Sequence, residues 1–214
     1  MTILRQSHYG SILERFMGKI QGMYSYVVEH DYGRSPNPDG GFCTLAFCKF
    51  SEDGVRRNVV EMAKLGDWIV GTGGNSDLSA GHGKLVYAML VTEKMTLQDY
   101  FRDPRFKLRA GNEMHLASST NRYALISEHF FFFGDSAPKF ETRHLDYPIE
   151  KRGPAHRSIS FTKEFIADFV TWLEAKYTVG IHGEPCAKLD QEPETRETLQ
   201  FLVKCTPPRK HVVC

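Results

Sequence analysis

Cys43, Asp67 and His182 are side chains whose types could supply a nucleophile, an acid and a base. His182 lies between Gly180 and Gly183, where backbone can approach a ligand closely. Each residue also has a structural interpretation: a small buried thiol for Cys43, a turn-capping carboxylate for Asp67 and a turn histidine for His182. The sequence does not show whether the three side chains meet, so they are candidate catalytic residues.

Metal and cofactor chemistry find no support in the residue spacing. The five cysteines are odd in number and irregularly spaced, which argues against a disulfide framework and against compact zinc patterns. His129 and His144 have no histidine or carboxylate four residues later. The segment Gly71-Thr-Gly-Gly74 lacks the Lys-Ser/Thr ending of a P-loop, and a strand is expected after it. We therefore expect no metal and no cofactor.

A ligand-binding site is better supported, by a glycine-rich stretch over residues 64–74 and an apolar run over residues 84–92. Aromatic rings of this region offer flat faces, basic side chains offer charge, and glycines allow close approach of the backbone. The candidate ligand-binding residues are Tyr24, Tyr26, Asn37, Thr44, Trp68, Gly71, Thr72, Gly73, Lys84, Tyr87 and Arg105. The alternatives are core packing for the aromatic residues and local turns or ion pairs for the polar ones.

The elements that must position these residues follow from the hydrophobic patterns. Residues 23–30, 42–50, 122–133 and the two halves of residues 64–92 have the patterns of strands. Helical spacing predicts helices over residues 11–21, 96–102 and 161–177, the second with Thr96 as its N-cap. This order predicts an α+β domain over residues 23–183, preceded by a helical extension over residues 1–22 and followed by a partly irregular tail over residues 184–214.

Composition limits the classes of function. With 214 residues, of which 41% are hydrophobic, the chain can form one core and a small appendage. A net charge of +1 provides no global cationic field for nonspecific binding to nucleic acid, so any basic surface must be local. No run of 18 apolar residues and no secretory signal are present. We therefore expect a cytoplasmic protein that does not bind membranes.

An ordered set of short motifs resembles the nucleotide modification associated domain family, second type. The motifs are Met23-Tyr-Ser-Tyr-Val-Val, Asp31-Tyr-Gly with Pro36-Asn-Pro38, Gly41-Phe-Cys-Thr-Leu-Ala46 with Cys48-Lys49, Gly66-Asp-Trp-Ile-Val-Gly-Thr-Gly73, Leu85-Val-Tyr-Ala-Met89, and Ala124-Leu-Ile-Ser with Phe131-Phe-Phe-Gly134. The resemblance implies a setting in bacterial or phage systems that make or handle hypermodified DNA bases. The segment Gly111-Asn-Glu-Met-His115 departs from the family pattern.

A looser similarity links the order of strands and glycines to the PUA-like group of small β-barrels, which includes the EVE and YTH domains. This similarity implies a small mixed or antiparallel β-barrel with flanking helices that holds a modified base in a pocket. The leading hypothesis is therefore binding of a modified base or nucleotide, in DNA or RNA, within a modification or defence system. The alternatives are an enzyme of nucleobase hypermodification that uses the same pocket, and a subunit that binds a protein partner through residues 11–21.

Overall fold

The computed structural model describes residues 22–46, 59–106, 123–140, 149, 156–157 and 161–187 of the chain. These residues form an α+β fold, as predicted. In chain order the elements are β1 (Met23–Val28), β2 (Cys43–Leu45), α2 (Val59–Met62), β3 (Trp68–Gly73), β4 (Leu85–Leu90), β5 (Glu93–Thr96), α3 (Leu97–Arg102), β6 (Tyr123–Ser127), β7 (His129–Phe132), η2 (Gly134–Ser136), β8 (His156–Arg157), α4 (Lys163–Lys176) and β9 (Gly180–Ile181). The predicted helix over residues 11–21 lies outside the described residues.

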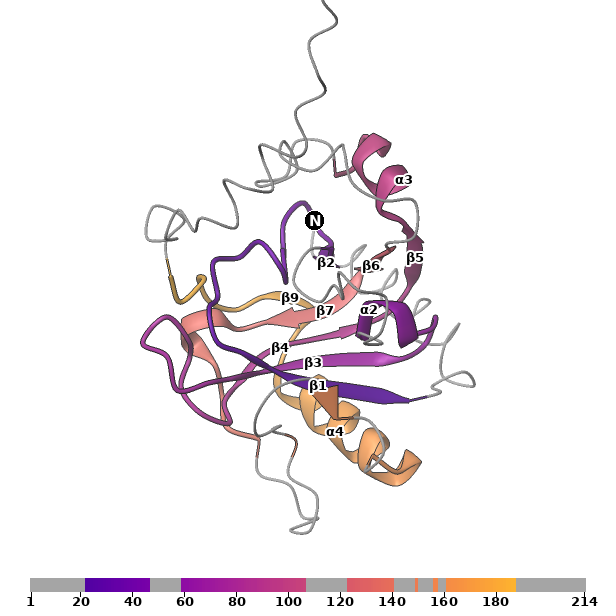
Figure 1. Ribbon diagram of the computed structural model, residues 1–214. Helices are drawn as coiled ribbons and strands as arrows, with labels where there is room; N and C mark the ends of the chain where they lie inside the picture. The colour runs from indigo at the N-terminus through magenta and orange to yellow at the C-terminus, as the bar shows by residue number, and fades with distance from the viewer. Residues whose placement is uncertain are drawn as a thin grey trace, which may run out of the picture.

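A six-stranded sheet with the order β8-β1-β3-β4-β7-β9 runs through the centre of the molecule (Figure 1). The two strands predicted within residues 64–92 are β3 and β4; β3 pairs in parallel with β1 and antiparallel with β4. Every residue of β3 and β4 is buried, which fits their nearly continuous apolar sequences. Strand β4 pairs in turn with β7.

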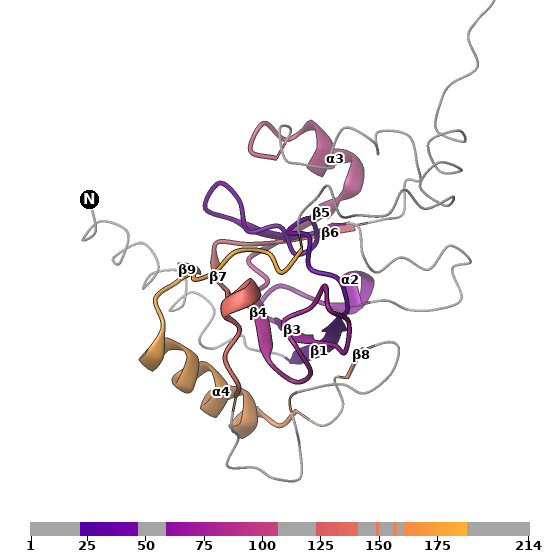
Figure 2. The same ribbon diagram turned by 90° about the vertical axis from the view of Figure 1, so that its left-hand side faces the viewer.

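Helix α4 covers one face of this sheet, and its position opposite the small sheet is visible in Figures 1 and 2. The predicted N-cap is present, since the Thr162 hydroxyl accepts a hydrogen bond from the Phe165 amide at 3.2 Å. Residues Phe165, Phe169 and Leu173 recur at helical spacing and are buried against the sheet. This face also buries Trp68 of β3.

A small three-stranded sheet with the order β2-β6-β5 covers the opposite face, together with α2. Cys43 and Leu45 of β2 and Leu125 of β6 are buried in one apolar cluster with Ile69 and Met89 of the large sheet. The outer face of the small sheet packs against α3 in a further cluster. The described strands therefore form two packed sheets; the predicted PUA-like barrel remains an expectation.

Residues 122–133 were predicted as one strand, and this prediction is wrong, because the segment forms β6 and β7 in different sheets. The chain changes sheet at Glu128. There the Ser127 hydroxyl accepts a hydrogen bond from the His129 amide at 3.1 Å and donates one to the His129 carbonyl at 2.7 Å. A serine that bonds the backbone two residues later turns the chain locally, and apolar periodicity carries no sign of it.

A strand that was not predicted, β5, lies between β4 and α3. Thr96 is the N-cap of α3, as predicted, and accepts a hydrogen bond from the Asp99 amide at 3.1 Å. Within the part of the chain that the structure describes, no helix has the length and apolar character needed to span a membrane.

Candidate functional site

The predicted catalytic aspartate caps a turn at the start of β3. The Asp67 carboxylate accepts a hydrogen bond from the Lys64 amide at 2.8 Å, and only 3% of the residue is exposed. Burial raises the pKa of Asp67, and the hydrogen bonds from the Lys64 and Gly22 amides lower it in part. Asp67 therefore holds together the turn that precedes β3 and the residue that precedes β1.

The predicted catalytic histidine lies near the other end of the sheet. The His182 amide donates a hydrogen bond to the Phe132 carbonyl, and Phe132 lies level with Tyr87 and Gly71 across the sheet. Gly71 is four residues beyond Asp67 on an extended strand, so about 13 Å of β3 separates the two levels. The structure therefore does not bring His182 and Asp67 together.

The described thiols are poor nucleophiles. Cys43 is fully buried in β2 among apolar side chains, on a different sheet from both Asp67 and His182. Cys186 is half-buried, and desolvation together with the negative charge of Asp31 raises the pKa of its thiol to about 12. Neither thiol is part of a disulfide.

The two aromatic residues predicted to stack on a ligand lie on opposite faces of the large sheet. Trp68 packs beneath α4, whereas Tyr87 packs beneath the small sheet, and both are 0% exposed. The Trp68 indole N–H finds no hydrogen-bond partner among the described residues. A ligand could therefore reach either ring only if the surrounding core moved.

Tyr26 and Tyr87 form a buried pair in which the two hydroxyl oxygens are hydrogen bonded at 2.8 Å. Gly71 makes room for this pair, because a Cβ atom at position 71 would lie 2.3 Å from Cε1 of Tyr87. Tyr24, on the same strand as Tyr26, is half-buried. The structure thus brings together Tyr26, Gly71 and Tyr87, three of the predicted ligand residues, around an interior polar contact.

The remaining predicted residues of β3, Thr72 and Gly73, contact the backbone of the protein itself. The Thr72 hydroxyl donates a hydrogen bond to the Tyr26 carbonyl at 3.4 Å. A Cβ atom at Gly73 would lie 2.1 Å from the Gly81 carbonyl oxygen, so glycine at this position allows the β3–β4 connection to fold onto itself.

Asn37 and Thr44 meet in an isolated antiparallel bridge, with amide-to-carbonyl distances of 2.9 and 3.0 Å. The Thr44 hydroxyl is hydrogen bonded to that of Tyr100 in α3 at 3.0 Å. These contacts fix the loop after β1 onto the small sheet.

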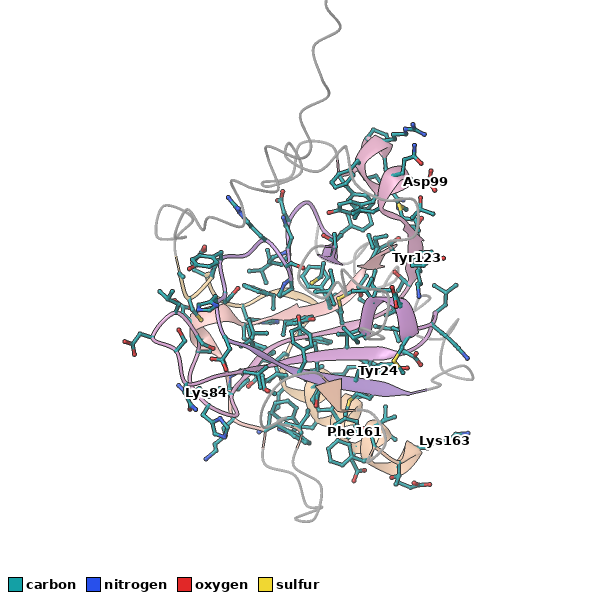
Figure 3. The ribbon with its side chains drawn as sticks, viewed as in Figure 1. Tyr24, Lys84, Asp99, Tyr123, Phe161 and Lys163 are labelled. Atoms are coloured by element: carbon teal, nitrogen blue, oxygen red, sulfur yellow. The ribbon has the colours of Figure 1, made fainter. Side chains whose placement is uncertain are left out.

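Arg105 is held by carboxylates on the small-sheet side of the molecule. Its guanidinium lies 2.9 Å from Glu93 and 2.6 Å from Asp103, and it also lies over the Phe106 ring. Hydrogen bonds to Asp103 and Glu93 raise the pKa of Arg105. Figure 3 shows Asp99 of the adjacent α3 and Lys84 on opposite sides of the molecule, so the predicted basic residues do not form one patch.

What the structure does assemble is a group of four segments at one end of the large sheet, residues 29–35, 73–84, 134–139 and 182–187, here termed the loop end. Asp31 joins three of them. Its carboxylate accepts hydrogen bonds from the Gly33 and Cys186 amides, both at 3.2 Å, and its own amide donates to the Leu78 carbonyl. Burial is the main reason that the pKa of Asp31 is raised.

The fourth segment joins through Asp135, whose amide donates to the Glu184 carbonyl at 2.8 Å. A Cβ atom at Gly134 would lie 1.9 Å from that same carbonyl oxygen, so the two segments touch through their backbones. The loop end is therefore fixed by contacts between residues far apart in the sequence.

Two aromatic side chains flank Asp31 at this end. The rings of His30 and Tyr32 are stacked, with centroids 6.2 Å apart and planes 12° apart. The Tyr32 hydroxyl oxygen is buried and finds no hydrogen-bond partner among the described residues. Unlike Trp68, Tyr32 keeps part of its surface exposed, and His30 is exposed. A ligand can reach the exposed part of this stacked pair, and a small local movement would bring it to the Tyr32 hydroxyl.

Neither His30 nor Tyr32 was among the predicted site residues. The signal that could have found them is their position, since they flank Asp31 in the loop that follows β1, two residues before Gly33. Among the residues that the structure describes, no group of three or more His, Cys, Asp or Glu side chains could hold a metal ion.

Comparison with known proteins gives one match. Residues 20–116 and 110–192 match the family described as nucleotide modification associated domain 2. No curated protein and no solved structure matches the chain.

Proposed function

Because the chain belongs to the nucleotide modification associated domain 2 family, we propose that it binds a modified base or nucleotide of DNA or RNA at the loop end. The setting of the proposal is a base-modification or defence system of bacteria or phages. Family membership supports a role in nucleotide modification systems. The proposal adds a binding site, the loop end, and a ligand, the modified base.

The observation that carries the proposal is the stacked pair of His30 and Tyr32 with the buried hydroxyl of Tyr32. Recognition of a base needs a flat face for stacking and a polar group for the base edge. Stacking contributes about 1 to 3 kcal/mol per base, so one accessible aromatic pair can supply much of the affinity. Asp31 supports both rings, since its hydrogen bonds fix the backbone between them.

The PUA-like architecture is part of the same proposal. The two packed sheets would act as a rigid support, and the loops at one end of it would hold the base. The buried Tyr26 and Tyr87 pair then lies in the core next to the loop end, where its hydrogen bond helps to hold β1 and β4 in position.

Tyr32→Phe tests the proposal, because it removes the hydroxyl and keeps the ring. Loss of a buried hydroxyl without a partner should leave the free protein as stable as the wild type or up to about 1 kcal/mol more stable. The same change should weaken binding of the preferred modified nucleotide about tenfold, since one hydrogen bond is lost. Thermal shift against a panel of modified nucleoside monophosphates identifies that ligand, and titration calorimetry measures the affinity.

Tyr123→Phe is the matched control, because Tyr123 is an exposed tyrosine on the small sheet and should not affect binding. The proposal fails if no member of the panel stabilises the wild type. It also fails if Tyr32→Phe lowers the melting temperature and leaves the affinity unchanged, because the hydroxyl is then structural.

An enzyme of nucleobase hypermodification is the second candidate, and one observation favours it. Nε2 of His182 lies 2.7 Å from the Thr178 carbonyl oxygen, and the ring stacks on Phe133 at 5.0 Å. A carbonyl partner assigns the proton to Nε2 and leaves Nδ1 of neutral His182 as an acceptor. Mass spectrometry of nucleosides after incubation with DNA would detect a new product, and its loss in His182→Phe would favour catalysis.

A further inference from the structure

Lys84 and Lys139 stand directly opposite each other in an isolated antiparallel bridge at the loop end. In such a bridge the two side chains leave on the same side of the backbone, with Cβ atoms about 4.5 to 5.5 Å apart. Like charges placed directly opposite repel each other and destabilise the pairing. The protein therefore keeps two ammonium groups where its own fold does not favour them.

Neither lysine forms an ion pair within the part of the chain that the structure describes. Both lysines are exposed. The buried Asp31 carboxylate of the loop end accepts hydrogen bonds from two backbone amides and not from a lysine. The Asp135 carboxylate accepts hydrogen bonds from the Glu184 amide and the Ser136 hydroxyl.

The backbone beneath Lys84 is firmly held. The amide of Lys84 donates to the Gly81 carbonyl at 3.2 Å, and the Lys84 carbonyl accepts from the Gly73 amide at 2.7 Å. The next residue, Leu85, donates to the Pro138 carbonyl at 2.7 Å, which ties this strand to the segment that carries Lys139. The two lysines therefore start from fixed positions, which reduces the ordering that an anion would have to impose.

The end of the Lys84 side chain lies against Gly81. A Cβ atom at position 81 would lie 3.8 Å from Cε and 4.0 Å from Nζ of Lys84, so the ammonium group lies over this glycine. The φ angle of Gly81 is +97°, a conformation that side-chain-bearing residues rarely adopt. The same glycine thus allows the loop its backbone conformation and lies next to the charge of Lys84.

We infer that Lys84 and Lys139 together bind one phosphate group. This inference rests on the proposed function and names its ligand class, which is a phosphorylated nucleotide or the sugar-phosphate backbone and not a free base or nucleoside. A phosphate between the two ammonium groups accepts hydrogen bonds from both and removes their mutual repulsion. Stacking on His30 and Tyr32 would then select the base, while the lysine pair supplies affinity without sequence preference.

The first test uses inorganic phosphate and the variants Lys84→Gln, Lys139→Gln and the double variant. In chloride buffer each variant should be at least as stable as the wild type, because the repulsion is relieved. Inorganic phosphate should raise the melting temperature of the wild type and leave that of the double variant unchanged. Lys163→Gln, at the exposed start of α4, is the matched control for loss of one charge and should respond to phosphate as the wild type does.

The second test separates the two sources of phosphate. A modified nucleoside, its 5′-monophosphate and a single-stranded oligonucleotide that carries the same base are titrated against the wild type and the double variant. Tight binding of the monophosphate indicates a terminal phosphate, whereas tight binding of the oligonucleotide alone indicates the backbone. Each lysine substitution should weaken binding about tenfold and should reduce the slope of log affinity against log salt by about 1.

The inference fails if the double variant binds phosphate and nucleotide with wild-type affinity and salt slope. The proposed function fails separately, if phosphate still acts through the lysine pair but no modified base is preferred over the unmodified one. A nucleoside that binds as tightly as its monophosphate overturns the lysine site and leaves base recognition intact.

Discussion

Two basic regions of this protein differ in what surrounds their charges. On the small-sheet side, Arg105 is bonded to Glu93 and Asp103, and the Lys94 ammonium donates to the carbonyls of Glu61 and Ala63. At the loop end, the opposed lysines form no ion pair among the described residues, and Asp31 and Asp135 accept hydrogen bonds from backbone amides. The two regions therefore differ in whether their basic groups are already bonded within the protein, and this decides which region is open to an anion.

The largest difference between the regions should appear when one aspartate of each is truncated. Asp31→Ala leaves the half-buried Gly33 and Cys186 amides without their acceptor and should lower the free energy of unfolding by about 3 kcal/mol. Asp103→Ala breaks an ion pair on the surface and should cost less than about 1 kcal/mol. Urea unfolding with comparable m-values measures both. Equal losses would show that Asp31 is not the support of the loop end.

The reactivity of the Cys186 thiol tests whether Asp31 lies beside it as a negative charge. Since the pKa of Cys186 is raised to about 12, its thiolate is about 1000-fold scarcer at pH 8 than for an ordinary cysteine. The higher nucleophilicity of a more basic thiolate offsets part of this, so iodoacetamide should label Cys186 about 50-fold more slowly than an unfolded control. Peptide mass spectrometry over a pH series gives the rate. Labelling that reaches its plateau near pH 9 would contradict the raised pKa.

The pH dependence of stability should have opposite signs in the two regions. Burial raises the pKa of Asp31, so its contribution is fully present below the unfolded value of 3.8 and is lost as pH rises through the folded value. Hydrogen bonds from Arg105 lower the pKa of Asp103, so its contribution is present above 3.8 and is lost as pH falls through the folded value. Unfolding midpoints of Asp31→Asn and Asp103→Asn, each compared with the wild type from pH 3 to 8, should therefore diverge in opposite directions.

The smallest effect is expected for Arg105→Gln. Its exposed ion pairs should contribute less than about 1 kcal/mol to stability, and its loss should leave oligonucleotide binding and its salt slope unchanged. Fluorescence anisotropy in a salt series measures both quantities. A decrease as large as that of Lys84→Gln would place the nucleic-acid surface on both sides of the molecule and remove the contrast between the regions.

The elements were largely predictable, because β1, β3, β4 and α4 each carry a complete hydrophobic pattern. The paired strands β3 and β4 were also predictable, since one connection joins them. The sheet change at Glu128 was not, because a single serine hydroxyl produces it. Apolar patterns identify elements and carry little information on which sheet an element joins.

The site was less predictable than the fold, for a reason that its hydrogen bonds make clear. Asp31 meets the Cys186 amide across 155 positions of sequence, and no local pattern announces such a contact. The glycines at positions 71 and 73 were identified as special, yet their contacts are with Tyr87 and Gly81 of the protein itself. Residues that look suited to a ligand can be suited instead to close packing.

The short passage from β6 to β7 at Glu128 couples the small sheet to the large sheet during local unfolding. Only one residue separates β6 of the small sheet from β7 of the large sheet, so neither sheet can move along the other without breaking the bonds of Ser127. The two layers should therefore behave as one cooperative unit in native-state hydrogen exchange, with amides of β2 and β7 exposed in the same opening event. The two sheets would then unfold together in one cooperative step, and only the loop end would contact the ligand.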